Sequence, residues 1–171
     1  WMGETQYRMG QYDAAQTYFL KYLSLEPSRM GSTYALANYN LGYIAFHRKA
    51  YPEASRYFNA FLNNDEEVDV TVRADAYNRL GDCAFRERIF DQANAFYRMA
   101  EQQQTSVGDY SLYQQAQLQG LQKDYDEKNQ LLDRLTTRFP QSAYVPYGLY
   151  EKGRSLVQLN QPQAAIQTFG D

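Results

Sequence analysis

A small residue recurs along this chain at a nearly constant spacing, and this period limits the folds open to it. These anchor residues lie 39, 39, 35 and 37 positions apart; they are Gly3, Gly42, Gly81, Ala116 and Gly153. Twelve positions after each lies an alanine slot, filled by Ala15, Ala54, Ala93, Lys128 and Ala165. Sixteen positions after each lies a large apolar residue: Phe19, Phe58, Tyr97, Leu132 and Phe169. Such self-similarity is the signature of a repeat array, in which each unit packs against its neighbours.

Each repeat reads as two helices joined by a short polar break. In the second repeat, Leu41, Ile44 and Ala45 follow the helical period of three and four residues. A break follows at residues 48–50, and the next helix carries the alanine slot and the large apolar residue. Small residues at the anchor and alanine positions let the two helices approach closely. We therefore predict an all-α fold, an α-solenoid of stacked antiparallel helix pairs.

Particular residues mark the expected helix ends. Pro27 and Pro140 are expected to stop the second helices of their repeats, because proline cannot continue a helix. Asp69 is an expected N-cap, since its carboxylate can accept hydrogen bonds from the first free backbone N–H groups of a helix.

We predict a single array of about five repeats over residues 1–171. The first and last repeats are expected to be partial, because both ends of the chain fall inside structural units. This makes the chain an expected fragment of a longer one, whose exposed ends are candidates for self-association. The predicted repeats are 1–29, 30–67, 68–106, 107–141 and 142–171.

The repeat resembles the tetratricopeptide repeat, whose signature is a Leu-Gly pair, an alanine, an aromatic residue four positions later and a late proline. Leu41-Gly42, Ala54 and Phe58 match it in the second repeat. The resemblance implies a right-handed superhelix in which the first helix of each repeat lines the inner surface. The spacing exceeds the usual period of roughly 34 residues. Other departures are Asn38, Tyr77 and Leu149, where the family prefers tryptophan, and Ala116, Lys128 and Leu132 in the fourth repeat.

A second resemblance concerns residues 138–144 and 150–153, which read RFPQSAY and YEKG. They are similar to the longer repeats of bacterial cell-envelope proteins, such as the periplasmic Tol-Pal-associated and outer-membrane-assembly repeat proteins. The resemblance favours a periplasmic or outer-membrane-associated location over the cytoplasm, and the sequence leaves the location open.

Charge and composition argue against several classes of function. The net charge of −3 lacks the basic excess of a nucleic-acid-binding domain. No apolar run approaches the roughly 18 residues that a membrane span requires. Cys83, the one cysteine, reads as a small buried residue, and His47, the one histidine, as a solvated or groove-rim residue. No phosphate-binding loop and no metal-ligand spacing occur. We therefore expect no enzyme, and no catalytic, cofactor-binding or metal-binding residues.

Tyrosine is the residue in excess, with 17 of 171 positions. Positions six and three before an anchor residue, and one and four after it, share one face of the first helix. Tyrosines gather on that face, where flat rings with a hydrogen-bonding tip suit an extended peptide. The alternative is that these rings pack between neighbouring first helices. The predicted groove residues are Tyr7, Tyr39, Tyr43, Phe46, Asn78, Asp82, Phe85, Tyr110, Tyr113, Gln117, Tyr147, Tyr150 and Arg154.

The sequence thus predicts a scaffold that holds a partner protein or peptide in a tyrosine-lined groove. Two alternatives remain open. The chain could be a structural spacer within a longer array, or its aromatic groove could bind carbohydrate.

Overall fold

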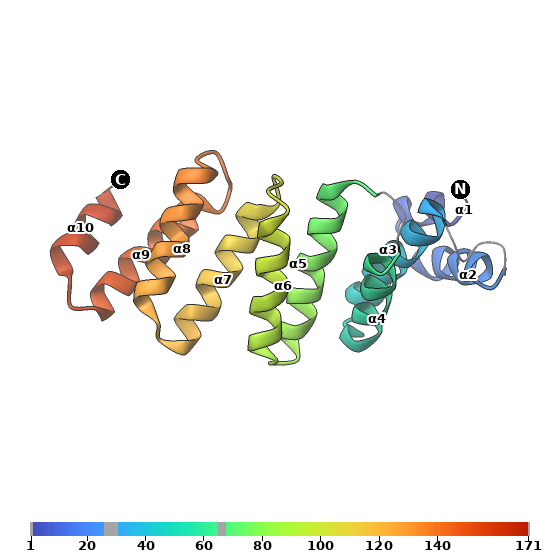
Figure 1. Ribbon diagram of the computed structural model, residues 1–171, viewed down its shortest axis with the longest axis horizontal. Coiled ribbons are helices and arrows are strands. Elements are labelled where there is room, and N and C mark those ends of the chain that lie inside the picture. The colour runs from blue at the N-terminus through green and yellow to red at the C-terminus, as the bar shows by residue number, and fades with distance from the viewer. Residues whose placement is uncertain (1, 26–30, 65–67, 171) are drawn as a thin grey trace. The chain divides into compact units, whose positions relative to one another are not determined.

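The computed structural model describes residues 2–25, 31–64 and 68–170, in which all regular secondary structure is helical (Figure 1). The all-α prediction is therefore confirmed. The helices are α1 (Met2–Arg8), α2 (Tyr12–Leu23), α3 (Ser32–His47), α4 (Tyr51–Leu62), α5 (Val70–Arg86), α6 (Phe90–Gln102), α7 (Gly108–Gln122), α8 (Tyr125–Arg138), α9 (Val145–Gln158) and α10 (Pro162–Gly170).

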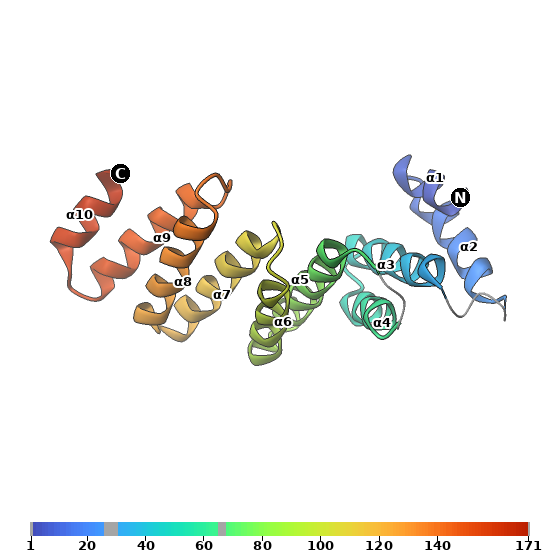
Figure 2. The same ribbon diagram turned by 45° about the horizontal axis from the view of Figure 1, so that its top comes forward.

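The chain forms two compact units, residues 1–93 and 94–171, with the boundary inside α6. In the first unit α1 packs against α2, α3 packs against α4, and α4 also packs against α5. In the second unit α7 packs against α8 and α9 against α10, while α8 joins the two pairs by packing against α9. Figures 1 and 2 show α8, α9 and α10 following one another side by side. The repeat boundaries predicted above stay predictions.

The anchor glycines provide space for the aromatic residue of their own repeat. A Cβ added at Gly42 would lie 2.7 Å from a ring carbon of Phe58, and one at Gly3 would lie 2.9 Å from Phe19. Phe58 is fully buried, so its ring lies against the backbone of the first helix. The fourth repeat places a Cβ at the anchor, Ala116, and Leu132 at the aromatic position; both are fully buried. A smaller partner thus accompanies a larger anchor residue.

The turn inside each helix pair has the same backbone conformation. The residue seven positions after each anchor has a φ between 57° and 73°; these residues are Gly10, Lys49, Arg88, Lys123 and Asn160. The next N–H donates back to a carbonyl five residues earlier, as from Ala50 to Ala45 at 3.0 Å. These are the bonds of a Schellman motif, which satisfies carbonyl groups at the end of the first helix.

The expected helix ends are partly confirmed. The Asp69 carboxylate accepts hydrogen bonds from the backbone N–H groups of Thr71 at 2.7 Å and Val72 at 3.3 Å, so Asp69 caps α5. The helix α8 ends at Arg138, two residues before Pro140. Pro27 lies outside the described residues.

The packing at Gly42 generates a stability prediction. We expect Gly42→Ala to lower the free energy of unfolding by about 1–3 kcal/mol, because the new Cβ overpacks the contact with the Phe58 ring. Urea unfolding followed by circular dichroism measures the change. The control is the double variant Gly42→Ala with Phe58→Leu, which copies the pair of the fourth repeat. We expect it to be more stable than the sum of the two single changes predicts; strict additivity would contradict the assigned contact.

Candidate functional site

In the first unit, two predicted groove tyrosines bind the same carboxylate. The hydroxyl groups of Tyr39 and Tyr43 on α3 both donate to Oδ2 of Asp75 on α5, at 2.7 Å for Tyr39. Arg79 joins this carboxylate to another: its Nη1 lies 2.6 Å from Asp82 Oδ2, and its Nε lies 3.6 Å from Asp75 Oδ1. These five residues, here termed the Asp75 network, link α3 to α5.

The Asp75 network fixes the chemical state of its tyrosines. Burial raises the pKa of Tyr39 and of Tyr43 far above the ordinary value, and the negative charge of Asp75 raises both further. Both hydroxyls therefore stay protonated and act as donors. The hydroxyls of Tyr39 and Tyr43 thus bind a residue of the first helix of the next repeat. This is the arrangement expected if the tyrosines pack between neighbouring first helices.

The other predicted residues of the first unit lie at different depths. Asn78 is 1% exposed and Asp82 is 8% exposed, so neither side chain is presented to solvent as its helical position suggested. Asp82 is instead paired with Arg79 of the same helix. Tyr7, Phe46 and Phe85 are half-buried. Whether any of them binds a partner stays a prediction.

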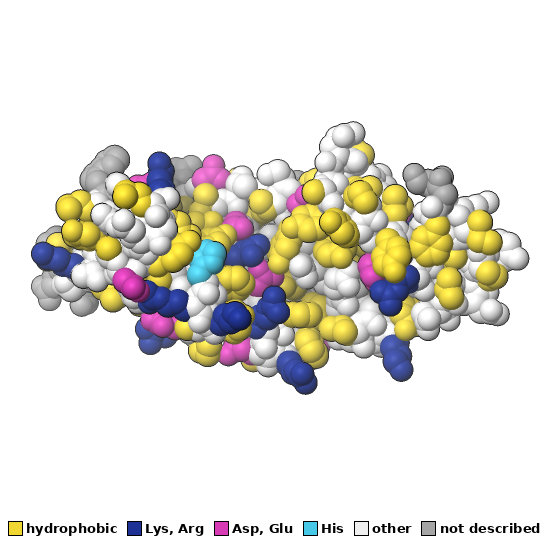
Figure 3. All heavy atoms as spheres, turned by 180° about the vertical axis from the view of Figure 1, so that it is seen from behind, with side chains coloured by type: hydrophobic (Ala, Val, Ile, Leu, Met, Phe, Trp, Pro, Cys, Tyr) yellow, Lys and Arg dark blue, Asp and Glu magenta, His cyan; other side chains and the backbone are white. Residues whose placement is uncertain are grey.

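His47 lies exposed at the end of α3, as expected of a solvated residue (Figure 3). Its ring stacks on Tyr12, with the ring centroids 5.3 Å apart and the planes 20° apart. Tyr7 in turn packs against Tyr12 at 5.6 Å. The histidine thus joins an aromatic row that also includes Tyr43 at 6.5 Å.

In the second unit, the predicted residues lie on α7 and α9. Tyr110 and Tyr113 of α7 both pack against Tyr144, with ring centroids 5.6 Å and 5.3 Å away. Tyr147 is 63% exposed and Tyr150 is 57% exposed. We use the term α7–α9 face for Tyr113, Gln117, Tyr147, Tyr150 and Arg154.

The α7–α9 face borders a pocket of about 410 Å³ that is lined by both helices and by α8. Gln117 and Arg154 contribute to its wall. Lys128, which is 5% exposed, reaches it from α8, and its Nζ donates to Glu151 Oε2 at 2.6 Å. Arg154 donates to the other oxygen of Glu151 at 3.0 Å. The pocket therefore has two cations around one carboxylate.

Sequence reasoning did not select Lys128 or Glu151 as site residues. The signal for Lys128 was its place in the alanine slot, where a long charged side chain needs both space and a partner. Gly120 provides the space, since a Cβ there would lie 3.2 Å from Lys128 Nζ. Glu151 provides the partner. Burial alone would raise the pKa of Glu151, but Lys128 and Arg154 outweigh that effect and hold its pKa below the ordinary value.

Cys83 is completely buried, as expected of a small core residue. Burial raises the pKa of its thiol to about 11, so the thiol is protonated near neutral pH. Across the described ranges no three His, Cys, Asp or Glu side chains gather where they could hold a metal ion. In the same part of the chain, no helix is both long and apolar enough to cross a lipid bilayer.

Known proteins resemble this chain in sequence pattern and in fold. Two sequence profiles of the tetratricopeptide repeat match residues 2–68 and 110–142. No curated protein sequence matches the chain. Solved structures with the same arrangement of helices share 12–17% of its residues, which shows similarity of fold alone. They confirm the predicted all-α solenoid of helix pairs.

Three of these structures illustrate the similarity. The crystal structure of MamA has a TM-score of 0.80 and 16% identity, over 99% of this chain and 85% of that one. YrrB, described as a TPR protein with an unusual peptide-binding site, has a TM-score of 0.74 and 17% identity, over 97% and 78%. MamA from Desulfovibrio magneticus RS-1 has a TM-score of 0.72 and 12% identity, over 98% and 87%. The cell-envelope location and the self-association are not tested by these similarities and stay predictions.

The pair of Lys128 and Glu151 generates a stability prediction. We expect Glu151→Gln to lower the free energy of unfolding by about 3–5 kcal/mol, because it leaves the Lys128 ammonium buried without its carboxylate. The matched control, Lys128→Met, removes the buried charge itself, so we expect a smaller loss. Thermal and urea unfolding measure both; an equal loss in the two variants would contradict the prediction.

The same pair predicts a pH dependence. Because the pKa of Glu151 is lower in the folded chain than in the unfolded one, its contribution is complete above the ordinary carboxyl pKa. The contribution is lost as the pH falls through the lowered pKa. Wild type should therefore lose more stability than Glu151→Gln between neutral and strongly acidic pH, as urea unfolding at a series of pH values measures. Parallel losses would show that Glu151 does not contribute.

The burial of Cys83 predicts its reactivity. At pH 7.5 we expect native protein to react with a thiol reagent such as iodoacetamide far more slowly than urea-unfolded protein, because the folded thiol is buried and protonated. Mass spectrometry of the labelled chain measures the two rates. Native labelling as fast as that of the unfolded chain would show that Cys83 is accessible.

Proposed function

This chain belongs to the tetratricopeptide repeat family, and from that premise we propose that it binds a protein or peptide partner through the α7–α9 face. Proteins of this family are typically scaffolds rather than enzymes, and the fold is consistent with protein–protein interaction. The single observation that carries the proposal is the exposure of Tyr147 and Tyr150 on that face.

The α7–α9 face has the composition of a binding surface. Tyrosine and arginine are the residue types that most often dominate binding energy at protein interfaces. The Arg154 guanidinium lies over the ring of Tyr150, 5.8 Å from its centroid, within the range of a cation–π contact. Burial raises the pKa of Tyr113, and the negative charge of Glu151 raises it further, so the Tyr113 hydroxyl remains a donor. The neighbouring pocket offers a recess for a side chain of the partner.

The predicted aromatic residues of the first unit differ in what they can offer a partner. Tyr39 and Tyr43 direct their hydroxyls to Asp75, so these hydroxyls are not available to a partner. Tyr7, Phe46 and Phe85 retain half-exposed rings. We propose that these three rings make apolar contacts with a partner.

The experiment is a selection of peptides from a random display library against the whole chain. We expect selected peptides to bind the variant with Tyr147→Ser and Tyr150→Ser at least about tenfold more weakly than wild type, because hot-spot aromatic residues carry most of the affinity. Calorimetry measures the affinities. Tyr18→Ser is the matched control, since Tyr18 is an exposed tyrosine, at 38%, on a second helix.

The outcomes separate the three functions considered. Peptides that bind the double variant and wild type equally would place binding away from the α7–α9 face. A glycan array that yields ligands lost in the double variant, with no selected peptides, would replace the proposal by carbohydrate binding. If neither library yields a ligand, the chain acts as a spacer and the proposal is overturned.

A further inference from the structure

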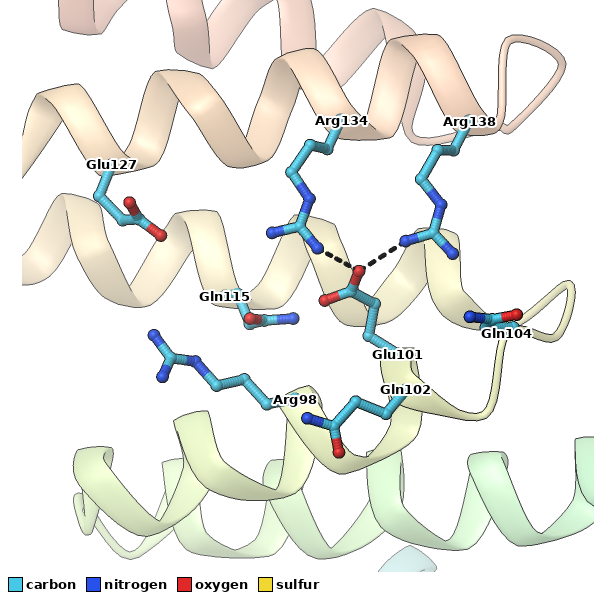
Figure 4. A pocket seen from close by; sticks show the side chains of 8 residues that line it. All are labelled: Arg98, Glu101, Gln102, Gln104, Gln115, Glu127, Arg134 and Arg138. Carbon is cyan, nitrogen blue, oxygen red and sulfur yellow. Dashed lines mark hydrogen bonds and ion pairs between the residues drawn. The ribbon is translucent and has the colours of Figure 1, made fainter.

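The second unit has another pocket, shown in Figure 4, which contacts a different side of α7 from the pocket beside the α7–α9 face. It has a volume of about 300 Å³ and is lined by side chains of α6, α7 and α8. Gln115 of α7 lines this pocket and Gln117 lines the other one. Residues two positions apart on a helix point in nearly opposite directions, about 200° around its axis. The two pockets are therefore separate sites.

Arginines dominate this pocket. Arg134 and Arg138 extend from α8 toward Glu101 of α6, and Arg98 lies on the α6 side (Figure 4). Glu101 and Glu127 are the acidic residues of the lining, which leaves a net charge of +1. The chain as a whole has a net charge of −3, so the lining of the pocket has the opposite sign to the chain.

One buried carboxylate holds two of the arginines. Glu101 is 8% exposed, and its Oε1 accepts from Arg134 and from Arg138, at 2.6 Å for Arg138. Each guanidinium carries five N–H donors, and this bond engages only one of them. The side chains of Arg134 and Arg138 are 48% and 38% exposed, so their other donors are accessible from the pocket. Glu101 therefore orients the two guanidinium groups and leaves most of their N–H donors available to a ligand.

We propose that this pocket binds a phosphate group, as inorganic phosphate or as a phosphorylated side chain of another protein. The fork of a guanidinium matches the oxygens of a phosphate, which can accept paired hydrogen bonds. A phosphate monoester has three acceptor oxygens and about two negative charges near pH 7. Three arginines from two helices, around one pocket, match that charge and number of acceptors better than they match a single carboxylate.

Binding of phosphate has a structural consequence. Arg134 and Arg138 already connect α8 to Glu101 of α6, and a phosphate bound to Arg98 as well would add a second connection between the same helices. A ligand that binds only the folded chain stabilises it in proportion to its occupancy. The inference does not rest on partner binding through the α7–α9 face, because Tyr147 and Tyr150 are absent from this pocket.

The test uses the whole chain with inorganic phosphate, a phosphoserine peptide and the same peptide with serine. We expect phosphate and the phosphopeptide to raise the melting temperature and to bind in calorimetry, and the serine peptide to do neither. Arg134→Gln should weaken binding by about tenfold or more, because it removes charge-assisted hydrogen bonds. Arg56→Gln, at an exposed arginine of α4, is the matched control and should bind as wild type does.

Glu101→Gln separates loss of folding from loss of binding. It removes the negative charge that holds Arg134 and Arg138, so we expect a lower melting temperature without ligand. It also raises the net charge of the pocket to +2, so we expect tighter phosphate binding. Binding of phosphate but not of the phosphopeptide identifies the free ion as the ligand, and tighter binding of the phosphopeptide identifies a modified protein.

Other results would overturn the inference. It is wrong if neither wild type nor Glu101→Gln binds either probe, or if Arg134→Gln binds phosphate as Arg56→Gln does. The variant with Tyr147→Ser and Tyr150→Ser should bind phosphate normally, so a failure of the partner-binding proposal is distinguishable from a failure here.

Discussion

The contact between an aromatic ring and the backbone of a glycine is the interaction on which the helix pairs depend. Where the first helix carries glycine, as at Gly42, the ring of Phe58 occupies the volume that a Cβ would need. This contact sets how closely the two helices of the pair approach each other. The rings of Tyr39 and Tyr43, which belong to the Asp75 network, pack edge-on against the same Phe58 ring.

The fourth repeat shows how this constraint can be met differently. Ala116 is larger than the usual anchor glycine, and Leu132 is smaller than the usual aromatic residue opposite it. In the alanine slot, Lys128 has a buried ammonium group instead of a methyl group. Its charge is balanced by Glu151 of the next helix pair, so the departure from the repeat pattern becomes a polar connection between α8 and α9. The same stretch of α8 carries Arg134 and Arg138 on another side. The least regular repeat therefore lines both charged pockets of the second unit.

Much of the fold could be predicted from the sequence, because the relevant information is local and periodic. The helix pairs follow from the spacing of small and aromatic residues, and the cap at Asp69 follows from its place before an apolar helix. The hydrogen-bond partner and the exposure of each tyrosine could not be predicted, because the position of a residue on a helix does not show what its hydroxyl contacts. The Tyr39 hydroxyl donates to Asp75, 36 residues later, whereas the Tyr147 side chain is exposed to solvent. Lys128 stood out as an exception, but its partner could be identified only from the packing of α8 against α9.

The left-handed turn inside each helix pair has a practical consequence. Four of the five turn residues carry side chains, Lys49, Arg88, Lys123 and Asn160, and all four are exposed. Their conformation is held by backbone hydrogen bonds, so the side chain itself contributes little to the turn. These positions are therefore suitable attachment points for spectroscopic labels. Labels at Lys49 and Lys123 would report the separation of the two compact units in solution while leaving both pockets and the exposed tyrosines untouched.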